Sequence, residues 1–156
     1  VSNARARGLE LALGARPSTG VRLRAAYTWL DTEIQSVDRA DGQAPSPYRV
    51  GEALIRRPRH QGSFSATATE GRFTAFVDGV IRGQVRDIEP SYGAFGGVFT
   101  ARGYSTVTAG ATLRVTRIID GLLRVENIDG RRYEEALGFP SPGRTAMVGV
   151  RVAVGR

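Results

Sequence analysis

The stretch VRLRAAYTW, residues 21–29, decides the fold, because its apolar and polar residues alternate with a period of two. In an extended chain, successive side chains point to opposite faces. One face would carry Val21, Leu23, Ala25, Tyr27 and Trp29. The other would carry Arg22, Arg24, Ala26 and Thr28. The stretch therefore predicts a β-strand with one apolar and one polar face.

The same period recurs along the chain, over residues 9–16, 62–69, 73–86, 105–116, 123–125 and 145–154. Together these runs predict about seven strands and an all-β fold without a convincing helix. The connections between them alternate in length. Short ones fall at 16–20, 69–71 and 116–121, and long ones at 32–58, 87–103 and 127–144. This alternation predicts an antiparallel up-and-down meander with all the short turns at one end and all the long loops at the other.

Composition excludes several classes of protein. No stretch approaches the roughly 18 consecutive apolar residues of a membrane helix, although alternating membrane strands would escape that test. All 22 basic residues are arginine and the net charge is +7, but the arginines are scattered without interleaved aromatic residues, which argues against nucleic-acid binding. The absence of cysteine excludes disulfides and thiolate metal sites. No motif for catalysis, a cofactor or a metal is present, so we expect neither an enzyme nor a bound cofactor.

The two faces differ in a way that bears on their surroundings. The apolar face is rich in alanine and glycine rather than in large core residues, and alternation alone leaves a soluble β-sandwich and a membrane barrel both open. The asymmetry of loop lengths favours the membrane, where Tyr27, Trp29 and Phe73 would form interfacial girdles. The polar face, which would then line a lumen, carries Glu10, Arg22, Arg24, Asp78, Arg82, Arg114 and Arg124. Because seven strands cannot close such a barrel, the chain would be part of a larger wall.

Five pieces of sequence carry a resemblance to a known family. In order they are NARARGLELAL, LRAAYTWLDTEI, RRPRHQGSFSA, GYSTVTAGATLRV and LLRVENIDGRRYEEALGFPSPGR. Together they resemble the C-terminal part of a TonB-dependent outer-membrane receptor, over essentially residues 1–156. The most specific piece is the last, and the residues that match the family's C-terminal motif are Asn127, Asp129, Tyr133, Glu134, Gly138, Pro142, Gly143 and Arg144.

The resemblance implies an architecture and a location. Members of the family form a barrel of about 22 strands plugged by an N-terminal domain, so this chain would supply the last seven strands. The protein would lie in the outer membrane of a Gram-negative bacterium, with its long loops outside. Its partners would be the membrane lipid, the plug of the same protein, the TonB complex and a small-molecule substrate. Family members commonly end on an aromatic residue, whereas this chain ends at Arg156.

The resemblance also implies active uptake of a scarce nutrient such as an iron–siderophore, cobalamin or a sugar. The long loops supply the candidates for substrate contact, which are Tyr48, Tyr92, Phe95, Phe99 and Arg102. The charges of the polar face would pair with each other and with the plug, because an unpaired buried charge is expensive. Two alternatives stay open at this point: a passive porin-like channel in the same membrane, and a soluble β-sandwich binding module.

Overall fold

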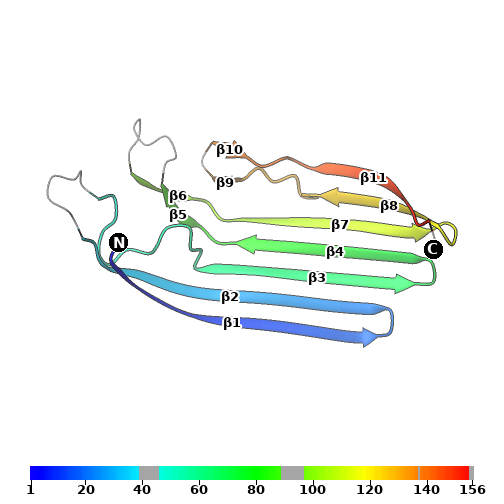
Figure 1. Cartoon of the computed structure of the whole chain (residues 1–156), viewed down its shortest axis with the longest axis horizontal. Coiled ribbons are helices and arrows are strands. Elements are labelled where there is room, and N and C mark those ends of the chain that lie inside the picture. The colour runs from blue at the N-terminus through cyan, green and yellow to red at the C-terminus, as the bar shows by residue number, and fades with distance from the viewer. Residues whose placement is uncertain (39–45, 89–96, 137, 155–156) are drawn as a thin grey trace.

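The computed structural model describes residues 1–38, 46–88, 97–136 and 138–154, and every regular element in these ranges is a β-strand. Seven strands form one antiparallel sheet in the order β1-β2-β3-β4-β7-β8-β11, as Figure 1 shows. Their bounds are β1 Asn3–Ser18, β2 Val21–Ser36, β3 His60–Glu70, β4 Phe73–Arg82, β7 Tyr104–Arg114, β8 Ile119–Glu126 and β11 Thr145–Val152. The predicted seven-stranded meander is confirmed.

The register of the sheet keeps the two faces separate. On the apolar face, one row of partners runs from Leu23 through Ala66, Val77 and Ala109 to Val125. Paired residues of neighbouring strands lie on the same face, so the period of two seen in each strand becomes one apolar and one polar surface of the whole sheet.

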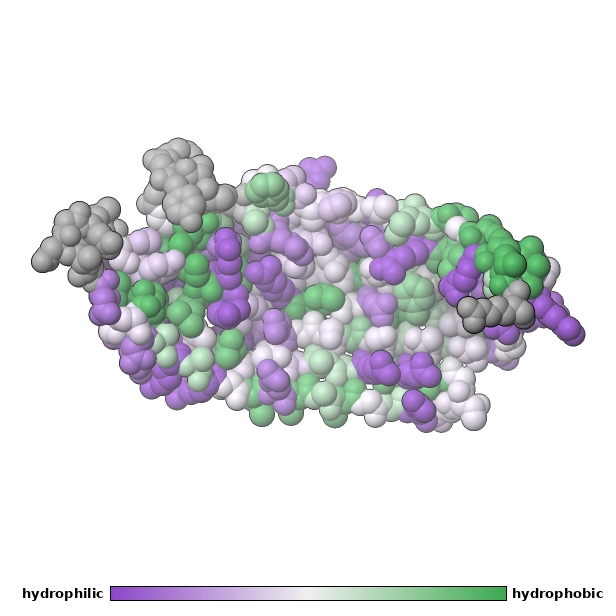
Figure 2. Space-filling view, viewed as in Figure 1, coloured by the Kyte–Doolittle hydropathy of each residue, from purple (hydrophilic) through white to green (hydrophobic). Residues whose placement is uncertain are grey.

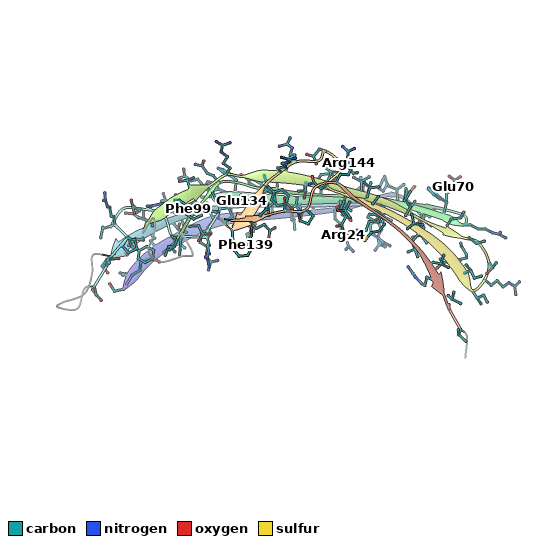
Figure 3. The ribbon with its side chains drawn as sticks, turned by 90° about the horizontal axis from the view of Figure 1, so that it is seen from above. Arg24, Glu70, Phe99, Glu134, Phe139 and Arg144 are labelled. Atoms are coloured by element: carbon teal, nitrogen blue, oxygen red, sulfur yellow. The ribbon has the colours of Figure 1, made fainter. Side chains whose placement is uncertain are left out.

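The sheet is curved, and its two faces lie on opposite sides of the arc. Figure 3 shows Arg24, from the polar face, on the concave side, and Glu70, from the apolar face, on the convex side. Figure 2 views the concave side, where hydrophilic residues are distributed along the length of the sheet. The polar face is therefore the inner surface of a curved wall.

Almost no hydrophobic core exists in the described part of the chain. Only Ile34 and Val85 are buried hydrophobic residues there, whereas Val148 on the convex face is 84% exposed. Water-soluble domains rarely expose a contiguous apolar surface of this extent. None of the described residues forms a helix long and apolar enough to cross a membrane.

Two phenylalanine rings cover glycines on neighbouring strands. On the convex face Phe64 of β3 pairs with Gly79 of β4, and its ring occupies the space where a side chain at Gly79 would start. On the concave face Phe76 of β4 covers Gly110 of β7 in the same way. A ring laid over a glycine on the next strand supplies the packing that the glycine lacks.

Two small hairpins lie at the loop end of the sheet, for the most part inside the connections at 87–103 and 127–144 that the sequence predicts as long loops. One pairs β5 (Val85–Ile88) with β6 (Val98–Ala101), and the other pairs β9 (Glu134–Ala136) with β10 (Phe139–Pro140). Figure 1 shows both at the end opposite the short turns. The predicted strand over 73–86 is too long, because β4 ends at Arg82 and Val85 begins a separate sheet.

The β5–β6 hairpin is linked to the connection between β2 and β3, and buried residues lie in the hairpin and at the end of β2. Ile34 at the end of β2 is 1% exposed, and Val85 and Asp87 are 4% and 3% exposed. The Asp87 carboxylate accepts hydrogen bonds from Arg56 Nε at 2.7 Å and from the Ile88 amide at 2.8 Å. The hairpin therefore packs against the chain that connects β2 to β3.

Candidate functional site

A pocket of about 520 Å³ lies at the loop end of the sheet. One wall comes from residues 99–104, which lead from β6 into β7, and the other from residues 131–134, which lead into β9. The walls combine aromatic rings, guanidinium groups and one carboxylate. These side chains belong to Phe99, Arg102, Tyr104, Arg131, Arg132, Tyr133 and Glu134.

Two stacked tyrosines join the walls of this pocket. The rings of Tyr104 and Tyr133 lie 4.0 Å apart between centroids, with 16° between their planes. The Tyr104 hydroxyl donates a hydrogen bond to Glu135 Oε1 at 2.8 Å, and the Arg82 guanidinium lies 6.0 Å from the centre of the same ring. Tyr104 is the first residue of β7 and pairs with Arg82 of β4, so the stack ties the β9 segment to the concave face of the sheet.

A single asparagine fixes the wall that carries Tyr133. Asn127 is buried at the end of β8 and has a positive φ of 50°. Its Oδ1 accepts from the Arg131 amide at 3.0 Å, and its Nδ2 donates to the carbonyl oxygens of Arg131 at 2.8 Å and of Pro142 at 3.2 Å. One side chain thus closes the turn after β8 and holds the returning chain beside it.

The pocket is rich in positive charge. Three arginines line it against one carboxylate, that of Glu134. Arg131 is also paired with Asp129 at 2.6 Å, and Glu134 Oε2 accepts from the Gly138 amide at 3.1 Å. Guanidinium groups bind carboxylate, phosphate and other anionic oxygens through paired N–H donors, and they also stack on flat rings. The pocket is therefore suited to an anionic ligand with planar groups.

A second, smaller pocket of about 270 Å³ continues along the concave face. It shares Tyr104 with the first pocket and is lined by Thr28, Gln61 and Arg82. These residues form one row of cross-strand partners that reaches Glu10 on β1. The two pockets therefore adjoin at Tyr104, where the loop end meets the concave face of the sheet.

The predicted substrate-contact residues have different outcomes. Phe99 and Arg102 line the larger pocket. Tyr48 lies on the connection between β2 and β3, where its amide donates to Ser46 Oγ at 3.2 Å, and it lines neither pocket. Tyr92 and Phe95 lie outside the described residues.

The charged residues expected to line a lumen share the concave face by register. Arg114 and Arg151 flank Asp120, each at 3.9 Å, and Arg124 pairs with Glu126 at 2.8 Å. Arg124 also lies 6.0 Å from the ring centre of Phe76. Arg82 lies 6.0 Å from the ring centre of Tyr104. Within the described ranges, no ion pair within 4.0 Å involves the other four residues of this set, which are Glu10, Arg22, Arg24 and Asp78. These four groups are free to meet a surface laid against the concave face.

The aromatic residues expected at the membrane interfaces lie on the convex face. Trp29 pairs with Leu9 and Tyr27 with Leu11 near the middle of β2. The Tyr27 hydroxyl lies 2.7 Å from His60 Nδ1. Phe73 starts β4 directly after the short turn, at the opposite end of the sheet.

Other residues of the C-terminal motif shape the chain between β8 and β11. Gly138 has a positive φ of 81°, which suits glycine. The Thr145 hydroxyl donates to the carbonyl oxygen of Gly143 at 3.3 Å, and Pro142 offers its carbonyl oxygen to Asn127. Arg144 is exposed. These residues position the chain as it enters β11.

Sequence reasoning did not single out three residues of the larger pocket, which are Tyr104, Arg131 and Arg132. Tyr104 carries a signal, because it precedes Thr106 and Thr108 at a period of two and so belongs to the polar face. The two arginines have no such signal, since they lie in a turn. Within the described residues, no group of three His, Cys, Asp or Glu side chains lies close enough together to hold a metal ion.

Comparison with known proteins identifies a family. The sequence profile of the "TonB dependent receptor-like, beta-barrel" family matches residues 1–129. No curated protein sequence matches the chain.

Solved structures share the fold at low sequence identity. The siderophore receptor PiuA from Acinetobacter baumannii is 20% identical with a TM-score of 0.78, and 96% of this chain covers 22% of that chain. The ferric-catecholate import receptor Fiu from E. coli K12 is 19% identical with a TM-score of 0.74, and the match covers 96% of this chain and 21% of Fiu. The copper transporter OprC is 21% identical with a TM-score of 0.69, and the match covers 97% of this chain and 24% of OprC. The chain thus spans about a fifth to a quarter of the receptors whose fold it shares.

Proposed function

We propose a function for this chain, which belongs to the family of TonB-dependent receptors. It forms part of the wall, the inner surface and the outer loops of a receptor for active nutrient uptake across an outer membrane. The family consists of transport receptors rather than enzymes. The observation that carries the proposal is the arginine- and tyrosine-lined pocket, which opens onto the polar concave face at the loop end. A ligand bound in this pocket would lie at the outer end of the lumen, next to the long loops.

The chemistry of the pocket favours one substrate class among those expected. Three arginines and the stacked pair Tyr104–Tyr133 suit an anionic ligand with planar groups, such as an iron–siderophore. A neutral sugar would offer no anionic group to Arg102 and Arg132. PiuA is named as a siderophore receptor and Fiu as a ferric-catecholate importer, which agrees with this choice.

The partners follow from the two faces. We assign the convex apolar face to membrane lipid, since every large residue on it would otherwise meet water. Glu10, Arg22, Arg24 and Asp78 would pair with charges on a plug domain inside the barrel. The TonB complex would act through that plug. The family match favours this receptor over a passive porin-like channel, and the curved single sheet has no second layer of a soluble sandwich in its described residues.

Growth and binding measurements test the proposal. A strain that lacks the full-length receptor should lose growth on one iron–siderophore from a panel that also contains cobalamin and oligosaccharides. The double variant Arg102→Gln/Arg132→Gln should then weaken binding of that siderophore by about tenfold or more, because each charge-assisted contact contributes about 1.5–3 kcal/mol. The control Arg144→Gln removes an exposed arginine outside the pocket.

Two outcomes would contradict the proposal. Unchanged growth on every compound of the panel would argue against receptor function. Equal loss of binding in the Arg144→Gln control would show that overall charge, rather than the pocket, determines affinity.

A further inference from the structure

The convex face changes character at one row near the loop end. Up to the row Leu9–Trp29 it is apolar, and the next two rows of the same face are Arg7–Asp31 and Arg5–Glu33. The change occurs within one pair of residues on each strand. In a membrane barrel, the outward face turns from apolar to charged where hydrocarbon gives way to headgroups.

Arg7 and Arg59 form a clamp around one carboxylate at this boundary. Asp31 Oδ2 lies 3.0 Å from Arg7 Nη2, and Asp31 Oδ1 lies 2.7 Å from Arg59 Nη2. The side chains of both arginines are 63% exposed, whereas that of Asp31 is 19% exposed. The carboxylate therefore lies beneath, and the outer surface of the trio presents two oriented guanidinium groups with one net positive charge.

The surroundings of the clamp are amphipathic. Trp29 pairs with both Leu9 and His60, and the Tyr27 hydroxyl lies 2.7 Å from His60 Nδ1. Rings with a polar edge and an apolar body are enriched at the level where acyl chains meet headgroups. The Arg7–Asp31 row of the clamp thus lies next to the Leu9–Trp29 row on the same convex face, on the side toward the long loops.

From this arrangement we infer that Arg7 and Arg59 bind a phosphate group of a lipid in the outer leaflet. The inference rests on the membrane location in the proposed function. Each guanidinium has five N–H donors, and the contacts with Asp31 use Nε and Nη2 of Arg7 and Nη2 of Arg59. A lipid phosphate would accept the outward donors of both arginines.

The apolar face below the clamp selects a lipid over free phosphate. Leu9, Leu11 and Leu13 follow one another on the convex face and are 52%, 51% and 73% exposed. The acyl chains of a lipid whose phosphate sits in the clamp would cover these side chains. Free phosphate would gain nothing from them, so the two parts of the site together recognise one molecule.

The test uses the full-length receptor in detergent micelles with lipid A as the probe. The double variant Arg7→Gln/Arg59→Gln should lower retention of bis-phosphorylated lipid A by about thirtyfold, since each basic residue near a membrane surface contributes about 1 kcal/mol. The matched control Arg22→Gln/Arg24→Gln removes two arginines from the concave face of β2 and should leave retention unchanged. Lipid A without phosphates should bind the native receptor as weakly as bis-phosphorylated lipid A binds the double variant.

Three outcomes would overturn the inference. They are equal retention in the double variant and the native receptor, equal retention of lipid A with and without phosphates, and displacement of lipid A by millimolar inorganic phosphate. The outcome is separate from that of the proposed function, because retention requires no transport. Uptake of the siderophore should persist in the double variant, whose substitutions lie outside the pocket.

Discussion

The two hairpins at the loop end are folded by different forces. The β5–β6 hairpin rests on buried residues, among them Ile34, Val85 and the carboxylate of Asp87. The β9–β10 hairpin has no such core, and Phe139 on it is 70% exposed. It is held instead by the Asn127 side chain and by the Tyr104–Tyr133 stack. One hairpin is therefore a small packed unit, and the other is a tethered arm beside the pocket.

The largest effect is expected from Asp87→Ala, because it removes the buried acceptor of the packed hairpin. Arg56 Nε and the Ile88 amide would lose their common partner, at a cost of about 3 kcal/mol. Hydrogen exchange of the Arg56 amide, which donates to the Arg86 carbonyl, should become faster in the full-length receptor. The control Asp38→Ala alters an exposed residue after β2, and equal acceleration in both variants would mean that Asp87 has no special role.

A smaller effect, about 2 kcal/mol, is expected from Asn127→Ala, which releases the tethered arm. The substitution removes three hydrogen bonds to backbone and places alanine at a positive φ. Exchange of the Ser141 amide, which donates to Tyr133, should accelerate while the Arg56 amide is unaffected. Asn127→Gly relieves only the φ strain, so it should fall between alanine and the native residue. Simultaneous loosening of both hairpins would refute the separation drawn between them.

The smallest effect is a pH dependence of the contact between the packed hairpin and the connection from β2 to β3. The Arg86 guanidinium lies 2.7 Å from Glu52 Oε2 and holds the pKa of that carboxyl below its usual value. A depressed pKa stabilises the folded state above the unfolded pKa, and this contribution is lost as the pH falls through the folded value. Protection of the Gly51 amide, which donates to the Ile34 carbonyl, should therefore decrease on acidification below the ordinary range of a glutamate. Arg86→Gln should abolish the dependence, and its persistence would assign it to another group.

The meander and its two faces follow from sequence, whereas the hairpins do not. Alternation at residues 21–29 is a local property that the register merely extends across the sheet, so the strands and faces were predictable. Val85 continues the alternation of β4 and yet leaves the sheet for β5, where its side chain is buried. No local sequence pattern predicts that the chain leaves the sheet at this point.

The pocket was predictable only in part, for a related reason. Phe99 and Arg102 were expected from the composition of a long loop, but the partner wall comes from residues 131–134. The position of that wall depends on the buried side-chain amide of Asn127. The motif that contains Asn127 indicates the family, but it does not predict the hydrogen bonds that this side chain makes. A contact between two distant parts of the chain does not show in the local pattern of either part.

The ring of Phe64 over Gly79 has a consequence for how such a wall can change over generations. A side chain at position 79 would meet that ring, so even alanine there requires the ring of Phe64 to move. A shorter residue at position 64 alone would leave the glycine uncovered. The two positions are thus expected to be inherited as a pair, and descendants of this sequence should alter both or neither.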